Sequence, residues 1–191
     1  MFFSPMHCQV QERQENPAYL RYRRILDLVF PRKESGRLSL FLRITSTSSP
    51  DCQVALIDRG KGAYQVVLHS LRDNRESVAV QANEIILRTG EADAARIAEK
   101  IPIVVEQVNV PAAVVQGWMK DFSQIKFSPM LISPHVLDGA HYDLWLSTHT
   151  SGAFYFSLVD SGVMDGKPHP LVRWMNRVVS ETKALAQQGS M

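Results

Sequence analysis

The feature that most constrains the fold is a pair of alternating segments in the last third of the chain. In residues 142–146, and again in residues 154–158, an apolar side chain occupies every second position. A period of two is typical of strands that bury one face, and the turn residues Thr150-Ser151-Gly152 between them predict a β-hairpin. An amphipathic helix should follow, because apolar residues recur at helical spacing at Leu171, Trp174, Met175 and Val178. We therefore expect residues 137–187 to form a hairpin with a closing helix packed against it.

The first half of the chain predicts a helix followed by a meander of strands. Asn16 followed by Pro17 is a good helix start, and Pro31 should end that helix. Alternating apolar residues then predict strands over residues 38–45, 52–57 and 63–69. A weaker fourth strand is expected around Val78 and Val80.

The middle of the chain is expected to be helical. Apolar spacing predicts one helix over residues 92–101 and another that starts at Pro111. Residues 103–108 are rich in β-branched side chains but follow a proline, so that segment is ambiguous between strand and helix.

Together these elements indicate an α+β fold. Runs of strands and helices, rather than strict alternation, favour an antiparallel sheet, built from the meander and the hairpin and packed by N-terminal, middle and C-terminal helices. We expect a single domain over residues 17–187, preceded by a polar, flexible arm of residues 1–16. The sequence leaves open whether the two sets of strands join into one sheet.

Composition excludes several classes of protein. Of 191 residues, 45% are apolar and 21% are charged, which suits one globular domain. A net charge of +2 is too mild to predict nucleic-acid or membrane-surface binding by itself. There is no apolar run long enough for a membrane span. The first residues lack the pattern of a secretory signal, which predicts a cytoplasmic protein, or a periplasmic one if a native signal was removed. Cys8 and Cys52 are expected to be two reduced thiols, with a single disulfide as the alternative.

The first strand of the hairpin carries the best candidate binding residues on its polar face. They alternate with the apolar row and are His141, Asp143, Trp145, Ser147 and His149. Neighbours on one face of a strand lie about 7 Å apart, so His141 and Asp143 could share a metal ion or form a base with its orienting carboxylate. A solvated sheet face explains the polar members more simply. Trp145 fits that explanation poorly, because a large exposed aromatic side chain usually has a partner.

No complete catalytic motif is present. The chain lacks the Gly-x-Ser-x-Gly elbow, the Cys-x-x-Cys and His-Glu-x-x-His metal motifs and the EF-hand loop, so no cofactor is expected. A hydrolase or metal-dependent enzyme would have to be built on His141, Asp143 and His149. A second alternative is nucleic-acid binding through Arg21, Arg23 and Arg24, although a solvated helix face is the simpler explanation of that patch.

The C-terminal pattern also supports a resemblance. It consists of Leu137-Asp138-Gly139 before Tyr142-Asp143-Leu144, then Gly152, Phe154 and Phe156, and finally Pro170-Leu171 with Trp174. This pattern resembles small uncharacterised bacterial proteins with a DG…Y strand, a glycine-turn aromatic strand and a closing helix bearing a tryptophan. The resemblance covers the last third of the chain and concerns the fold. Some such proteins look like envelope or lipoprotein components, and others look like immunity proteins that neutralise toxins.

Our leading hypothesis is a non-catalytic domain that binds another protein. It follows from the incomplete catalytic sets and from the aromatic and charged face around Trp145. The resemblance adds the expectation of an immunity or accessory protein, whose partner would be a toxin or an envelope component.

Overall fold

One antiparallel sheet organises the molecule. The computed structural model describes residues 16–31, 37–46, 50–73, 76–126, 140–148, 152–160 and 169–189. Its strands are β1 (Arg37–Ser46), β2 (Cys52–Gly60), β3 (Ala63–Leu71), β4 (Ile103–Val110), β5 (Ala140–Thr148) and β6 (Gly152–Asp160). Within the described residues they form a six-stranded sheet of order β4-β3-β2-β1-β5-β6. The meander and the hairpin therefore belong to one sheet, joined where β1 pairs with β5.

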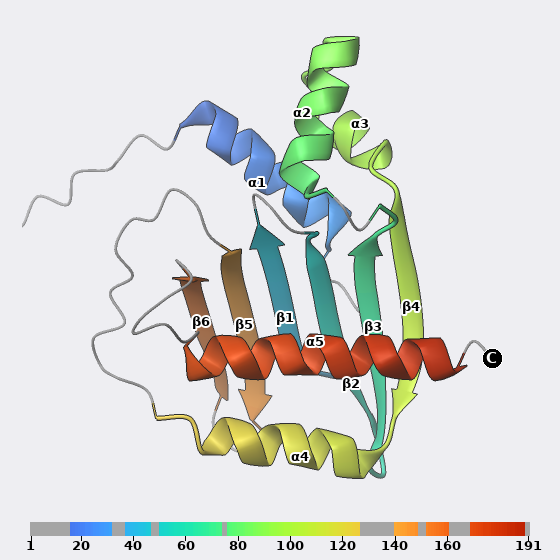
Figure 1. Ribbon diagram of the computed structural model, residues 1–191, viewed down its shortest axis with the longest axis vertical. Helices are drawn as coiled ribbons and strands as arrows, with labels where there is room; N and C mark the ends of the chain where they lie inside the picture. The colour runs from blue at the N-terminus through green and yellow to red at the C-terminus, as the bar shows by residue number, and fades with distance from the viewer. Residues whose placement is uncertain are drawn as a thin grey trace, which may run out of the picture.

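The helices lie on the faces and at one end of this sheet. They are α1 (Pro17–Val29), α2 (Val78–Thr89), α3 (Ala94–Glu99), α4 (Ala112–Ser123) and α5 (Pro170–Gly189). In Figure 1, α5 runs across the strands and α4 lies below it, while α1, α2 and α3 gather at one end of the sheet. Helices thus precede, separate and follow the strands, and the predicted α+β class is confirmed.

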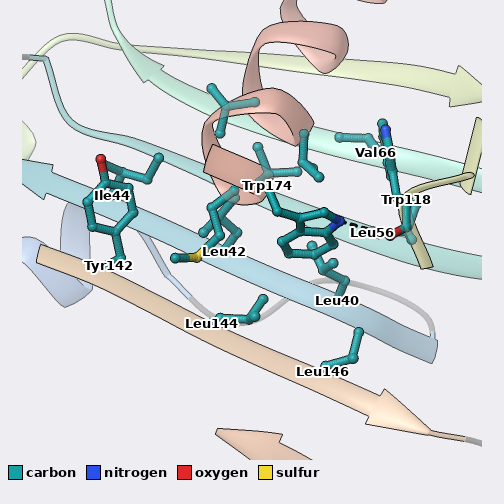
Figure 2. Close-up of a cluster of buried hydrophobic side chains, with 14 of the residues drawn as sticks. Leu40, Leu42, Ile44, Leu56, Val66, Trp118, Tyr142, Leu144, Leu146 and Trp174 are labelled. Atoms are coloured by element: carbon teal, nitrogen blue, oxygen red, sulfur yellow. Dashed lines mark hydrogen bonds between the residues drawn. The ribbon is translucent and has the colours of Figure 1, made fainter. Parts of the chain in front are cut away.

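The main core lies between the sheet and the two helices α4 and α5, on the side that we call the α5 face. Leu42, Leu144 and Leu56 point from neighbouring strands toward Trp118 and Trp174 (Figure 2). The Trp174 indole N–H donates to the backbone carbonyl of Trp118 over 2.8 Å, inside this cluster. Both indoles are buried, so polar and apolar contacts together hold α4 against α5.

The hairpin and its closing helix have the predicted arrangement. Tyr142, Leu144 and Leu146 of β5 belong to the core on the α5 face, and Phe156, which lies opposite Leu144 in β6, packs against it. The residues of α5 that we expected to lie against the hairpin, Leu171, Trp174, Met175 and Val178, are all buried. Residues 137–139 of the DG motif lie outside the described residues.

A second core forms where α1, α2 and α3 meet the end of the sheet. It contains Ile25 from α1, Phe30 directly after that helix, Leu71 from β3, Val78 from α2 and Ile97 from α3. Helix α1 begins as predicted, because the Asn16 side chain accepts a hydrogen bond from the backbone N–H of Ala18.

The weak fourth strand expected around Val78 and Val80 is wrong, because both residues belong to α2. Side chains satisfy the free N–H groups at the start of this helix. Ser77 accepts from the backbone N–H of Val80, and Asp51 accepts from that of Val78. The ambiguous segment 103–108 forms strand β4, and the predicted middle helices are α3 and α4.

Two further expectations concern the termini and the cysteines. Cys52 is a free thiol buried in β2, and burial raises its pKa to about 11. Cys8 and the rest of residues 1–15 lie outside the described residues, so the expected N-terminal arm stays a prediction. Within the described ranges, no helix is both long enough and apolar enough to cross a membrane.

Candidate functional site

The face of the sheet opposite α4 and α5, which we call the α1 face, carries a row of polar side chains. The strand register places Ser157, Asp143, Arg43, Gln53 and His69 side by side, each from a different strand from β6 across to β3. All but Ser157 are buried. Burying so many polar groups is unfavourable unless they are hydrogen-bonded. The hydrogen-bond partners of these side chains therefore show which parts of the protein the α1 face contacts.

The row corrects two expectations from the alternation pattern. Strand β1 was expected to be half-buried, yet Phe41 and Arg43 on its polar face are buried as well. Asp143 is likewise buried, so a solvated face is the wrong interpretation for this part of β5. Helix α1 is part of the reason, because Arg43 donates to Asp27 of α1 and to the Phe30 carbonyl that follows it, and α1 residues line one cavity with Asp143.

Arg43 fastens the C-terminal end of α1 to the sheet. Its Nη1 atom donates to Asp27 Oδ1 over 2.7 Å, and its Nη2 atom donates to the Phe30 carbonyl over 2.6 Å. Gln53 adds a hydrogen bond of 2.9 Å to the carbonyl of Pro31. The last carbonyls of a helix lack partners within the helix and carry partial negative charge, so a cation stabilises them. Pro31 follows the C-cap of α1, and the hydrogen bonds from Arg43 and Gln53 hold this end of the helix on the sheet.

Asp143 is the centre of a second set of hydrogen bonds. The Tyr155 hydroxyl donates to Asp143 Oδ1 over 2.8 Å, and His141 Nε2 lies 3.2 Å from the same oxygen. Ser157 Oγ lies 3.0 Å from His141 Nε2. Burial acts to raise the pKa of Asp143, but hydrogen bonds from His141, Tyr155 and Ser157 and the charge of His141 outweigh it and lower the pKa to about 2. Asp143 is therefore a buried carboxylate that is ionised at neutral pH.

A cavity of about 280 Å³ lies between α1 and these two sets of residues. We call it the α1 cavity. Its lining includes Tyr19, Tyr22 and Asp27 from α1 and His141, Asp143 and Tyr155 from the hairpin. This volume is near the lower end for ligand pockets, so it suits a single side chain or a small molecule.

The predicted site residues fall into three groups. His141 and Asp143 line the α1 cavity. Trp145 is half-buried on the same strand, where the register places it between Phe41 of β1 and Tyr155 of β6. Ser147 is part of β5 but is not among the residues that line the cavity, and His149 lies outside the described residues.

Sequence reasoning singled out Arg23 of α1 as part of a basic patch but did not place α1 against the hairpin. A signal was present, because Tyr19, Tyr22, Arg23 and Asp27 recur at the spacing of one helix face. The missing information was the partner of that face, Arg43, which follows in the chain only after the end of α1.

The hydrogen bonds of His141 do not form a catalytic relay. In a nucleophile–base–acid set, the nucleophile and the carboxylate bind opposite nitrogens of the imidazole ring. Here Ser157 and Asp143 both approach the same nitrogen, Nε2. Among the described residues, no three His, Cys, Asp or Glu side chains lie close enough together to hold a metal ion.

The arginines of α1 do not form one continuous basic surface. Arg23 lines the α1 cavity, whereas Arg21 lines a separate groove between α1 and α2 together with Asn83. Arg24 is exposed and lines neither. A nucleic-acid backbone needs several cations along one path, and these residues face different elements.

Comparison with known proteins leaves the geometry to carry the functional argument. No protein-family model matches the chain, and no curated protein or solved structure is significantly similar to it.

Proposed function

We propose that this chain is a protein-binding domain that recognises a partner protein through the α1 cavity. The observation that carries the proposal is the pair of exposed tyrosines that line this hollow, Tyr19 and Tyr155, with exposed fractions of 52% and 55%. Tyrosine offers a large contact area with few rotatable bonds and a hydroxyl for hydrogen bonding, and it is enriched at binding surfaces. A concave surface lined by such residues suits an inserted side chain of a partner.

The surroundings of the cavity favour binding because they hold it in one shape. The hydroxyl of Tyr155 is bound to Asp143, and the end of α1 is bound to Arg43. A surface whose side chains are already ordered loses less conformational entropy when a partner binds. Stoichiometric binding without turnover is all that an immunity or accessory protein needs, and we propose a role of that kind.

The chain offers matched variants for testing this proposal. The bait would be the wild-type protein, the double variant Tyr19→Ala/Tyr155→Ala, and the control Leu87→Ala. Leu87 lies on α2 with 86% of its side chain exposed and does not line the cavity. Circular dichroism would first establish that the three proteins are equally folded.

Affinity capture from the native host would then compare the three baits by quantitative mass spectrometry. We expect a protein that the wild type and the Leu87 control retain equally and that the double variant loses. A partner retained equally by all three baits would contradict recognition through the α1 cavity.

A further inference from the structure

We infer that the α1 cavity binds a basic side chain of the partner, a guanidinium or ammonium group held between tyrosine rings and carboxylates. This inference rests on the proposed function, because it names the chemistry of the group that the partner inserts. The evidence for it is the way in which the charged side chains that line the cavity are paired.

The two carboxylates of the cavity retain capacity for a cation. Among the described residues, the basic side chain in ion-pair contact with Asp143 is His141, at 3.2 Å. Its other hydrogen-bond donors, Tyr155 and Ser157, are neutral hydroxyl groups. Asp27 binds Arg43 through Oδ1 and keeps 54% of its side chain exposed. A second cation that enters the cavity therefore finds carboxylates that line it without displacing Arg43.

The cations of the cavity offer much less to an anion. Arg43 is 3% exposed, and its two terminal nitrogens are already bound to Asp27 and to the carbonyl of Phe30. Arg23 is exposed and lines the cavity. An inserted carboxylate would meet Arg23 but would also approach the ionised carboxylate of Asp143. Like charges in a partly buried site repel strongly, so the cavity favours a cation.

The aromatic lining supports the same choice. Tyr19, Tyr22 and Tyr155 all line the cavity, from α1 and from β6. The face of a tyrosine ring attracts a cation, and a guanidinium group can also stack on it. A volume of about 280 Å³ accommodates the end of one arginine or lysine side chain. Rings and carboxylates together select a basic group over a neutral one of similar shape.

The test uses small probes and the full chain. Amide resonances of the ¹⁵N-labelled protein would be followed by NMR during titration with N-acetyl-arginine amide, with its neutral near-isostere N-acetyl-citrulline amide, and with N-acetyl-glutamate amide. We expect the arginine probe to bind with a dissociation constant on the order of millimolar, as befits so small a ligand. Its largest shifts should lie at His141, Asp143 and Tyr155. The citrulline and glutamate probes should bind at least about tenfold more weakly because they lack the cation, and a tenfold difference corresponds to about 1.4 kcal/mol.

Two charge variants test the inference further, because their expected effects on binding of the arginine probe have opposite signs. Asp143→Asn should weaken binding of the arginine probe about tenfold. Arg23→Gln should strengthen it about threefold by removing a repelling cation from an exposed position. Glu84→Gln, which removes an exposed carboxylate from α2, is the matched control and should change nothing. Because Arg23 is exposed, its variant remains a valid test even if Asp143→Asn folds poorly.

Three outcomes would overturn the inference. They are equal binding of the arginine and citrulline probes, preferential binding of the glutamate probe, and the absence of binding by any probe. None of them affects the capture experiment, so a cavity with the wrong ligand chemistry is distinguishable from a surface that binds no partner. Conversely, cation-selective binding with no capture that depends on Tyr19 and Tyr155 would leave the cavity chemistry standing and would remove protein recognition.

Discussion

At the scale of single residues, Arg43 holds the end of α1 against the sheet. Burying a guanidinium is costly unless its charge is paired, and Arg43 pairs with Asp27 and with the Phe30 carbonyl. Its Nε atom is buried and has no hydrogen-bond partner among the described residues. The stabilisation from Arg43 therefore comes from its two terminal nitrogens, which contact the end of α1.

Replacing Arg43 should destabilise the protein in a way that lysine cannot restore. Arg43→Met removes the contacts to Asp27 and to the helix end, and we expect a loss of about 2 kcal/mol in the free energy of unfolding. Arg43→Lys should lose most of the same energy, because one ammonium cannot reproduce the two-nitrogen geometry. Urea unfolding monitored by tryptophan fluorescence measures both variants. A lysine variant as stable as the wild type would contradict this role of the guanidinium.

Asp143 should show its environment in the pH dependence of stability. Its pKa in the folded protein is about 2, below the value of about 3.9 expected for an unfolded chain. The unfolded state therefore binds more protons between these values, and stability falls as the pH is lowered from about 4 to about 2. We expect the stability difference between the wild type and Asp143→Asn to shrink over this interval. Unfolding curves at half-unit steps of pH check this, and a constant difference would contradict it.

At the scale of elements, two tryptophans join α4 to α5. Trp174 donates to the backbone of Trp118, and the indole of Trp118 donates to Glu181 over 2.7 Å. Arg177 bridges Asp121 of α4 and Glu181 of α5 at the surface. The ion pairs of Arg177 are exposed and contribute little to stability. The buried hydrogen bond from the Trp174 indole is therefore the specific contact between the two helices.

Removing that bond while keeping an aromatic ring should be measurable. Trp174→Phe removes the buried hydrogen bond to the Trp118 carbonyl, worth about 1 kcal/mol, and part of a buried ring, so the total loss should be about 1–3 kcal/mol. Trp145→Phe, on the half-buried polar face of β5, is the matched control and should cost less than about 1 kcal/mol. Equal losses in guanidinium unfolding of the two variants would show that the Trp174 bond has no special role.

Asp51 ties the turn between β1 and β2 to the start of α2. It accepts hydrogen bonds of 2.7 Å from the backbone N–H groups of both Ser46 and Val78, and it is buried. Asp51→Ala leaves two buried donors unpaired and should cost about 3 kcal/mol, while Asp51→Asn should cost less because one acceptor remains. Hydrogen exchange of the Ser46 and Val78 amides should accelerate in the alanine variant. Unchanged protection of both amides would exclude this role.

The contact between Asp51 and α2 also shows why the sequence predicts some elements and not others. Hairpin, closing helix and α1 follow from local spacing and from the Asn16 cap, so pattern alone predicts them. The start of α2 depends on a carboxylate far away in the chain, and the valines at positions 78 and 80 alternate as they would in a strand. Local pattern therefore favoured a strand, and a long-range hydrogen bond, together with the Ser77 cap, favours the helix.

At the scale of the whole molecule, the candidate site exists only because remote segments meet. The alternation in β5 predicts that His141 and Asp143 share a face away from the core, and they do. It cannot predict that β1 pairs with β5, which brings Arg43 opposite Asp143, or that α1 lines one cavity with the hairpin. Half of the cavity was thus visible in the sequence, and the other half depends on sheet register and helix docking.

The most direct test of this account is the dissociation constant of the captured partner, measured by isothermal titration calorimetry with purified proteins. Tyrosine is enriched among the hot-spot residues that cost about 2 kcal/mol or more when truncated, so Tyr155→Ala should weaken binding by at least about tenfold. Leu87→Ala should change the affinity by less than about twofold, because its side chain lies away from the cavity. Equal dissociation constants for the wild type and Tyr155→Ala would contradict recognition through the α1 cavity.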